Sequence, residues 1–195
     1  VYATVTRMPL PDRRDLPAIV AAGFLGITVY HLALNFGEQT VTAGAASLII
    51  AVSPVFTALF SRVLLDEHVT PWGWFGIGVS FGGVALITLG EGGGLGLEPG
   101  ALLILLAAFA TSAYFVIAKR PLRRYNALQF TTYMIWAGTV PMLVFAPGLL
   151  EQLPNAAPAD TWAVIYLGVF PAAIAYVMWS HALSRMPVSA LATFI

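Results

Sequence analysis

The chain of 195 residues contains no cysteine, and this absence removes several kinds of chemistry. Disulfides, thiolate nucleophiles and metal sites with cysteine ligands are all excluded. The sequence also lacks an HExxH metal motif, an aspartate-rich metal motif and a Gly-x-Ser-x-Gly nucleophile elbow. We therefore expect no catalytic residue, no metal ligand and no cofactor.

Charged residues are nearly as scarce. Asp, Glu, Lys and Arg make up only 9% of the chain, 59% of the residues are hydrophobic, and the mean hydropathy is +0.85. Nine basic and nine acidic side chains cannot cover the surface of a soluble domain of this length. The formal net charge of zero argues against a nucleic-acid partner, which requires a clustered basic face in water. The composition predicts an all-α protein embedded in the lipid bilayer.

The few charges divide the chain into apolar segments of about 20 residues, the length of helix that crosses about 30 Å of hydrocarbon. Segments rich in Gly and Pro separate several of them. Thr70 and Pro71 have the residue types of an N-cap and a first helical position. We expect six complete spans, at residues 17–37, 41–65, 70–90, 99–118, 127–147 and 161–183.

Basic residues gather on one side of the membrane if successive spans alternate in direction. All nine Lys and Arg residues then share one side, whereas the charges of the other side are all acidic. The positive-inside rule makes the basic side cytoplasmic. We expect a multi-pass protein of the cell (inner) membrane. Because the chain opens with Val1 rather than Met and stops at Ile195 within an apolar segment, we also expect further helices beyond both ends.

An ungapped shift of 145 residues aligns the first complete span with the sixth. The aromatic and polar stretch around His31 then meets the one around Tyr176. Four spans lie between these two, so the repeat unit has five helices and its second copy is inverted. Inverted repeats support alternating access to a site near the middle of the membrane. The other matched pairs are Pro9 with Pro154, Asp15 with Asp160, Gly23 with Gly168 and Ala45 with Ala190.

Three blocks of sequence resemble a known family. The first holds residues 42–48 and 53–59 with Leu65-Asp66-Glu67, Thr70 and Gly76, the second Ala113-Tyr114 with Lys119-Arg120, and the third residues 176–179 with Ala182-Leu183. Together they resemble the EamA-type members of the drug/metabolite transporter superfamily.

That resemblance implies a ten-helix fold of two inverted five-helix repeats, truncated here at both ends. Residues 1–90 would be the C-terminal part of the first repeat, and residues 99–195 the N-terminal part of the second. The implied function is export of small metabolites, amino acids or drugs, with protons as one option for the coupling ion.

Polar residues inside the spans are the candidates for a substrate pathway, because ionisable groups at membrane depth usually face a cavity or a partner. Thr28, His31, Asn35 and Glu38 are three or four residues apart, which predicts a polar stripe along one helix face. His31 could bind substrate or carry protons. The alternative for His31 is a single hydrogen bond between helices.

Backbone shape is the second source of candidates. Pro54 lies near the middle of a span, where it frees a carbonyl that Ser53 or Thr57 can bind. The resulting kink fits a hinge and a static bend equally. Gly78 and Gly82 have the spacing of a close helix-packing face.

Aromatic residues in the second half complete the set. Their rings with hydrogen-bonding ends suit amphipathic or aromatic solutes, although each could instead pack in the core. The sequence thus predicts a transporter for a small organic solute, and the alternative is a membrane-embedded enzyme or a lipid-handling scaffold without transport. The predicted pathway residues are His31, Asn35, Ser53, Pro54, Thr57, Tyr114, Tyr176, Trp179 and Ser180.

Overall fold

The structure is a computed structural model that describes residues 8–90 and 99–194, apart from the side chains of residues 84, 87–90 and 193. In these ranges all regular secondary structure is helical. Five helical segments are long and apolar enough to cross a membrane. The chain is therefore an all-helical, multi-pass membrane protein, as predicted. The five segments are Leu16–Gly37, Ala43–Leu65, Pro99–Arg123, Ala127–Asn155 and Pro158–Arg185.

The remaining predicted span, residues 70–90, forms the 20-residue helix α6 (Pro71–Gly90). The Gly73 amide donates to the Thr70 hydroxyl at 3.1 Å, so Thr70 caps the helix as its residue type predicts. A Cβ placed on Gly78 or Gly82 would meet no atom within 4 Å, so the predicted packing face has no neighbour in the described part of the chain. Because several α6 side chains are not described, its crossing of the membrane stays a prediction.

The first and last of the five segments each contain a π-helical stretch. Such wide turns are rare and often mark functional sites. Both stretches end at residues that the shift of 145 residues superposes, Val29 and Ile174. In chain order the first segment is α2 (Leu16–Gly23), a π-helical stretch (Phe24–Val29) and α3 (Tyr30–Gly37), and the last is α10 (Pro158–Leu167), a π-helical stretch (Gly168–Ile174) and α11 (Ala175–Arg185).

The second segment is interrupted between α4 (Ala43–Ile50) and α5 (Ser53–Leu65). The kink predicted at Pro54 is thus a break between two helices, with Pro54 in the first turn of α5. Proline has no amide hydrogen, so the Ile50 carbonyl four residues earlier loses its helical donor. Ser53 Oγ donates to that carbonyl at 2.7 Å, which confirms the prediction that a nearby hydroxyl replaces the missing amide.

Helix α8 (Ala127–Met142) begins at a capping box, in which Asn126 Oδ1 accepts from the Gln129 amide at 2.8 Å. The segment continues into α9 (Ala146–Gln152) and beyond the end predicted at residue 147. The predicted end is wrong because Pro147 lies in the first turn of α9, where proline is tolerated.

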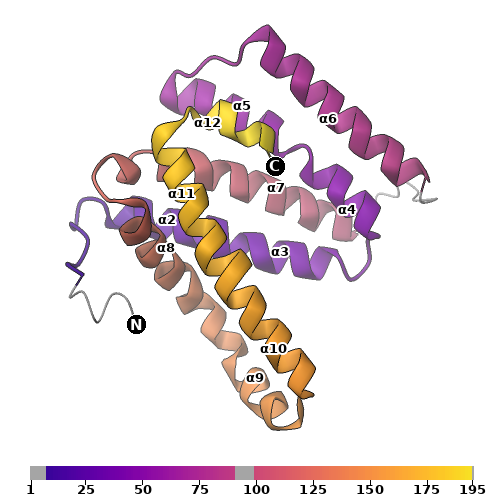
Figure 1. Cartoon of the computed structure of the whole chain (residues 1–195), viewed down its shortest axis with the longest axis vertical. Helices are drawn as coiled ribbons and strands as arrows, with labels where there is room; N and C mark the ends of the chain where they lie inside the picture. The colour runs from indigo at the N-terminus through magenta and orange to yellow at the C-terminus, as the bar shows by residue number, and fades with distance from the viewer. Residues whose placement is uncertain (1–7, 91–98, 195) are drawn as a thin grey trace.

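Helix α7 (Pro99–Ala118) is the centre of the fold and contacts α2, α3, α4 and α5. Helices α2 to α7 form the first arm of the fold. Figure 1 shows a second arm, formed by α8–α9 and α10–α11. This arm packs on α2 and α7 near one end of the molecule, while α9 and α10 lie well away from α3 and α4 at the other. The main core, which includes Ile19, Tyr114, Phe130, Met134 and Leu183, fills the region where the arms meet.

The two arms cross at a pair of glycines. A Cβ added to Gly23 would lie 2.4 Å from the Met134 carbonyl oxygen, and one added to Gly138 would lie 2.4 Å from the Gly23 carbonyl oxygen. The Thr28 hydroxyl also donates to the Gly138 carbonyl at 2.6 Å. Helices α2 and α8 therefore meet backbone to backbone, as small residues allow within membranes.

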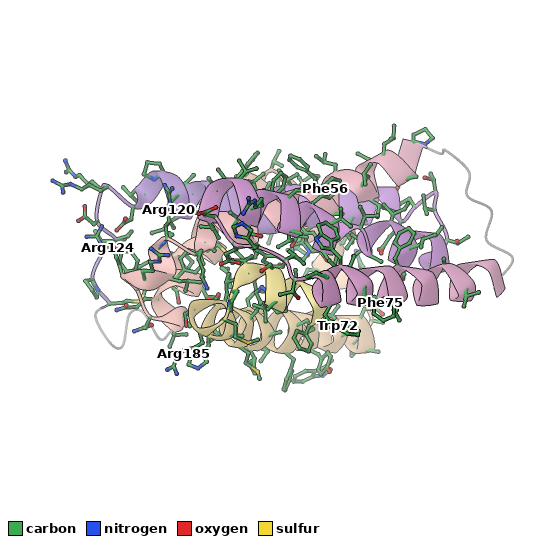
Figure 2. The ribbon with its side chains drawn as sticks, turned by 90° about the horizontal axis from the view of Figure 1, so that it is seen from above. Phe56, Trp72, Phe75, Arg120, Arg124 and Arg185 are labelled. Carbon is green, nitrogen blue, oxygen red and sulfur yellow. The ribbon has the colours of Figure 1, made fainter. Side chains whose placement is uncertain are left out.

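The ends of several helices are tied together where Arg120, Arg124 and Arg185 lie, which we call the basic end (Figure 2). Arg124 bonds the Asp15 carboxylate at 2.8 Å, and this neighbouring charge raises the pKa of the guanidinium above its ordinary value. Lys119 Nζ donates to the Leu183 carbonyl at 2.7 Å, at the C-terminal end of α11. These contacts join α2, α7 and α11 at one end of the fold.

A further tie at the basic end joins the two halves of the chain. Glu67, just after α5, accepts hydrogen bonds at 3.2 Å from both the amide and the hydroxyl of Ser189. Ser189 lies in the short helix α12 (Val188–Leu191), which packs on α5. Glu67 therefore has a structural role, because it holds α12 against the end of α5.

Replacing Gly138 with Ala should destabilise the protein by more than about 1 kcal/mol, because the new methyl would force the α2 and α8 backbones apart. The measurement is the thermal unfolding midpoint of the full-length protein in detergent. Gly148→Ala in α9 is the control, since its methyl would meet no atom within 4 Å and alanine favours a helix. Equal midpoints for the two variants would contradict the crossing.

Candidate functional site

Two of the predicted site residues meet between the arms. The Tyr176 hydroxyl on α11 lies 3.5 Å from His31 Nε2 on α3, and it donates to the Gly26 carbonyl at 3.1 Å. The Tyr30 ring packs edge-on to the imidazole with centroids 5.1 Å apart. This contact links two segments that lie 145 residues apart in the sequence.

Tyr114 of α7 lies beside this pair. Its ring centroid is 6.4 Å from that of Tyr176, and only 1% of its surface is exposed. A Cβ on Gly26 would lie 2.7 Å from the Tyr114 ring, so glycine leaves the space that the ring occupies. The Tyr114 hydroxyl lies near Ser180, but it forms no hydrogen bond of normal geometry with any described residue.

Helix α11 supplies two more predicted residues. The Trp179 ring lies 5.0 Å from that of Phe115, and Ser180 is fully buried. The Ser180 hydroxyl accepts a 2.8 Å hydrogen bond from Thr131 of α8. Sequence reasoning missed Thr131, because the adjacent Thr132 has the same residue type and only bonds the Leu128 carbonyl in its own helix.

We call the six residues that gather here the central cluster. It joins α3, α7, α8 and α11 between the two arms of the fold. Of its polar atoms, Tyr114 Oη and Trp179 Nε1 are buried and have no hydrogen-bond partner among the described residues. Buried polar atoms are usually paired, so orphaned ones need an explanation. The members are His31, Tyr114, Thr131, Tyr176, Trp179 and Ser180.

The predicted residues of α5 face a different neighbour. The Ser53 carbonyl accepts a hydrogen bond at 2.9 Å from Ser112 of α7, a residue that the sequence analysis did not single out. Thr57 is fully buried, and its hydroxyl has no partner within the described residues. The hydrogen bonds of Ser53 therefore join the start of α5 to the end of α4 and to α7.

The polar stripe predicted along the first span is divided in the structure. Thr28 bonds α8, His31 meets α11, and Asn35 is exposed with its amide donating to the His31 carbonyl at 2.7 Å. Because α8 and α11 pack on each other, Thr28 and His31 contact the same arm of the fold, whereas Asn35 and Glu38 are exposed. A stripe that lines a solute pathway stays a prediction.

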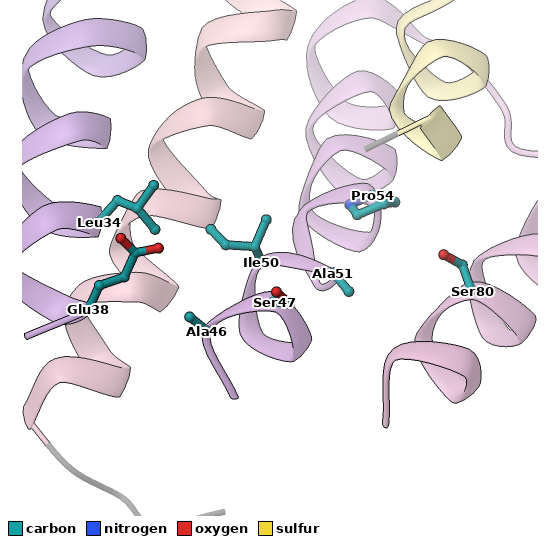
Figure 3. Close-up of a pocket in the computed structure, with 8 residues that line it drawn as sticks. All are labelled: Leu34, Glu38, Ala46, Ser47, Ile50, Ala51, Pro54 and Ser80. Atoms are coloured by element: carbon teal, nitrogen blue, oxygen red, sulfur yellow. The ribbon is translucent and has the colours of Figure 1, made fainter. Parts of the chain in front are cut away.

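A cavity of about 250 Å³ lies beside the break between α4 and α5 (Figure 3). Pro54, a predicted site residue, lies on its wall. Figure 3 shows Glu38 on the opposite side from Ser80, and Glu38 is the ionisable residue of the lining. The volume is below the range for drug-sized ligands, so the cavity could hold a small polar group. Its lining is Leu34, Glu38, Ala46, Ser47, Ile50, Ala51, Pro54 and Ser80.

We also searched the described residues for a metal-binding site. Across residues 8–90 and 99–194, no group of three or more His, Asp or Glu side chains is placed to hold a metal ion. The polar groups of the central cluster are hydroxyls, an indole and one imidazole. Such groups can bind and release a solute through hydrogen bonds.

Several curated proteins are similar to this chain. "Uncharacterized transporter YdfC" of Bacillus subtilis is 46% identical over 176 residues, which cover 90% of this chain and 58% of that protein. A "Probable terminal-alkyne amino-acid exporter" of Streptantibioticus cattleyicolor is 38% identical over 179 residues, covering 92% and 60%. "Uncharacterized inner membrane transporter YedA" of Escherichia coli is 31% identical over 170 residues, covering 85% and 54%. The chain thus spans 54 to 60% of the length of these relatives.

A solved crystal structure has the same fold. It superposes with a TM-score of 0.67 at 20% identity, over 98% of this chain and 68% of the other. The model of the EamA-like transporter family matches residues 1–89 and 98–195. These matches confirm the resemblance seen in the three sequence blocks, and the chain belongs to the EamA-like transporter family.

Proposed function

We propose that the whole protein exports small organic solutes by alternating access, and that the solute passes through the central cluster. The observation that carries this proposal is the buried, unpartnered pair of donors at Tyr114 and Trp179. They lie between membrane-spanning helices of a chain from a transporter family. An unpaired buried polar atom costs about 1 to 3 kcal/mol, which a bound solute with an acceptor group would offset.

Local structure supports an inverted repeat of five helices. The two π-helical stretches end at superposed residues, and α12 begins at Val188, which the same shift superposes on Ala43 at the start of α4. On this proposal, residues 1–90 belong to the first repeat and residues 99–195 to the second. The spans of the complete protein would then number ten.

The contact of His31 with Tyr176 also supports this symmetry. The shift of 145 residues superposes these two residues, and they lie side by side. Equivalent positions of two related units meet only near the axis that relates them. A pseudo-two-fold axis in the membrane plane is where inverted-repeat transporters bind their solutes. The central cluster would therefore lie near the axis that relates the two repeats, where a bound solute would be open first to one side of the membrane and then to the other.

The cluster also suggests the class of solute. Tyr114 Oη and Trp179 Nε1 can both donate, and the surrounding rings of Phe115 and Tyr176 are apolar surfaces. These groups suit a solute with a carboxylate or carbonyl next to an apolar or aromatic body. Amino acids are the first class to test, since one relative is named a probable amino-acid exporter.

The distribution of charge suggests how the protein is oriented in the membrane, and the family resemblance suggests the direction of transport. We place the basic end in the cytoplasm of a cell with the protein in its inner membrane, because basic residues are retained on that side. Outward transport is the direction that the resemblance implies. His31 is the first candidate for carrying a proton, since it is the histidine of the central cluster.

His31→Ala and Tyr176→Phe should each lower export by the full-length protein by about fivefold, the effect of losing a hydrogen bond of about 1 kcal/mol. The measurement is the initial rate of efflux at equal amounts of protein in the membrane. His181→Ala is the control, since His181 is an exposed residue that lies after the last member of the cluster on α11. Export at the control rate in both test variants would refute a pathway between His31 and Tyr176.

Tyr114→Phe separates binding from folding. The lost hydroxyl has no partner in the described structure, so the thermal midpoint should stay the same or rise, while the solute concentration for half-maximal export should increase several-fold. Tyr133→Phe is the matched control, because the Tyr133 hydroxyl donates to the Pro9 carbonyl and its removal should lower the midpoint. A Tyr114→Phe protein that is less stable and transports normally would give the hydroxyl a structural role only.

The substrate itself is sought with cells that express the full-length protein or an empty vector. Efflux of labelled amino acids, nucleosides and cationic drugs is compared between the two. We expect reproducible export of amino acids with apolar side chains. Verified membrane insertion with no export of any class would argue for a membrane protein that acts without transport, such as a lipid-handling scaffold.

A further inference from the structure

A second concavity, of about 220 Å³, lies toward the basic end and shares no residue with the central cluster. Its walls are aliphatic and come from three helices, α2, α5 and α7. Leu64 on one wall leaves 54% of its surface exposed. We call this concavity the basic-end groove, and its lining consists of Ala18, Leu64, Leu65, Val116, Ile117 and Arg120.

Arg120 is the charged residue of the groove. It lies two residues after the end of α7, and Figure 2 places it at the same end of the molecule as Arg124 and Arg185. Its side chain is exposed and forms no ion pair or side-chain hydrogen bond with any described residue. The groove thus combines an apolar interior with an unpaired guanidinium at its edge.

Neighbouring cations are used differently. Lys119 donates to carbonyls at the end of α11, and Arg124 is paired with Asp12 and Asp15. Arg62 pairs with Asp66 four residues later. No carboxylate lines the groove itself. An anion that approaches Arg120 therefore meets a positive charge that this part of the chain leaves unneutralised.

The membrane supplies a ligand with matching parts. A phospholipid presents a phosphate at the depth where juxtamembrane arginines lie, and the planar guanidinium can donate two hydrogen bonds to it. Its acyl chain would replace water or loose packing along the aliphatic walls. Basic residues at the cytoplasmic surface attract anionic lipids in particular.

We propose that the basic-end groove binds an anionic phospholipid, with its phosphate on Arg120 and an acyl chain between α2, α5 and α7. A ligand that binds the folded state alone raises stability by mass action. The lipid is thus expected to stabilise the protein.

The test uses full-length protein purified in detergent and mixed with phosphatidylglycerol or phosphatidylcholine. Native mass spectrometry measures the lipid that stays bound, and the thermal midpoint is followed in parallel. We expect retained phosphatidylglycerol and a raised midpoint for the wild type. Arg120→Gln should weaken retention by about tenfold, because the phosphate loses its charge-assisted hydrogen bonds to the guanidinium.

Arg123→Gln is the matched control. It removes the same charge three residues away, and Arg123 is exposed but does not line the groove. Its retention of phosphatidylglycerol should stay within about twofold of the wild type. Ile117→Trp is a second variant, which fills the groove without altering charge and should also reduce retention.

Three results would overturn the site. Equal losses in Arg120→Gln and Arg123→Gln would show diffuse attraction to the basic end, and equal retention of phosphatidylcholine would remove the role of the headgroup. A cross-link from Cys introduced at Ile117 to another segment of the same protein would show that the groove is filled by protein. None of these measurements requires export, so their outcome is independent of the proposed transport.

Discussion

The backbone contact between Gly23 and Gly138 is the constraint on which the rest of the arrangement depends. It sets α8 directly against α2, and α11 packs on α8. With α8 and α11 in this position, Tyr176 on α11 reaches His31 and the Gly26 carbonyl. The central cluster thus depends on two glycines that are not members of it.

Hydroxyl groups keep the irregular helices intact. Lipid offers no hydrogen bonds, so any carbonyl released by a break must be satisfied within the protein. The Ser53 hydroxyl donates to the Ile50 carbonyl, and the Ser112 hydroxyl donates to the Ser53 carbonyl. The Thr28 hydroxyl donates to the Gly138 carbonyl. With these contacts made, three buried polar atoms remain without a partner among the described residues: the hydroxyls of Thr57 and Tyr114 and the indole nitrogen of Trp179.

The sequence predicted the features that depend on composition and local spacing, but not those that depend on helix phase. Segment lengths, the Thr70 cap and the hydroxyl that serves the Pro54 break all follow from neighbours in the chain. The π-helical turn before His31 could not be predicted from residues that look like any apolar helix. In the structure Thr28 bonds α8 and His31 contacts α11. Thr131 was missed for a similar reason, since only the crossing angle separates it from Thr132.

The meeting of His31 with Tyr176 also bears on how such a protein can arise. Two identical chains that associate around a two-fold axis present the same residue to each other at that axis. A histidine would face a histidine there, or a tyrosine a tyrosine. Here an imidazole nitrogen faces a phenol. On the proposed inverted repeat, such a mixed pair becomes available once both halves belong to one gene and each can vary alone, so duplication followed by fusion would have opened this position to asymmetric chemistry.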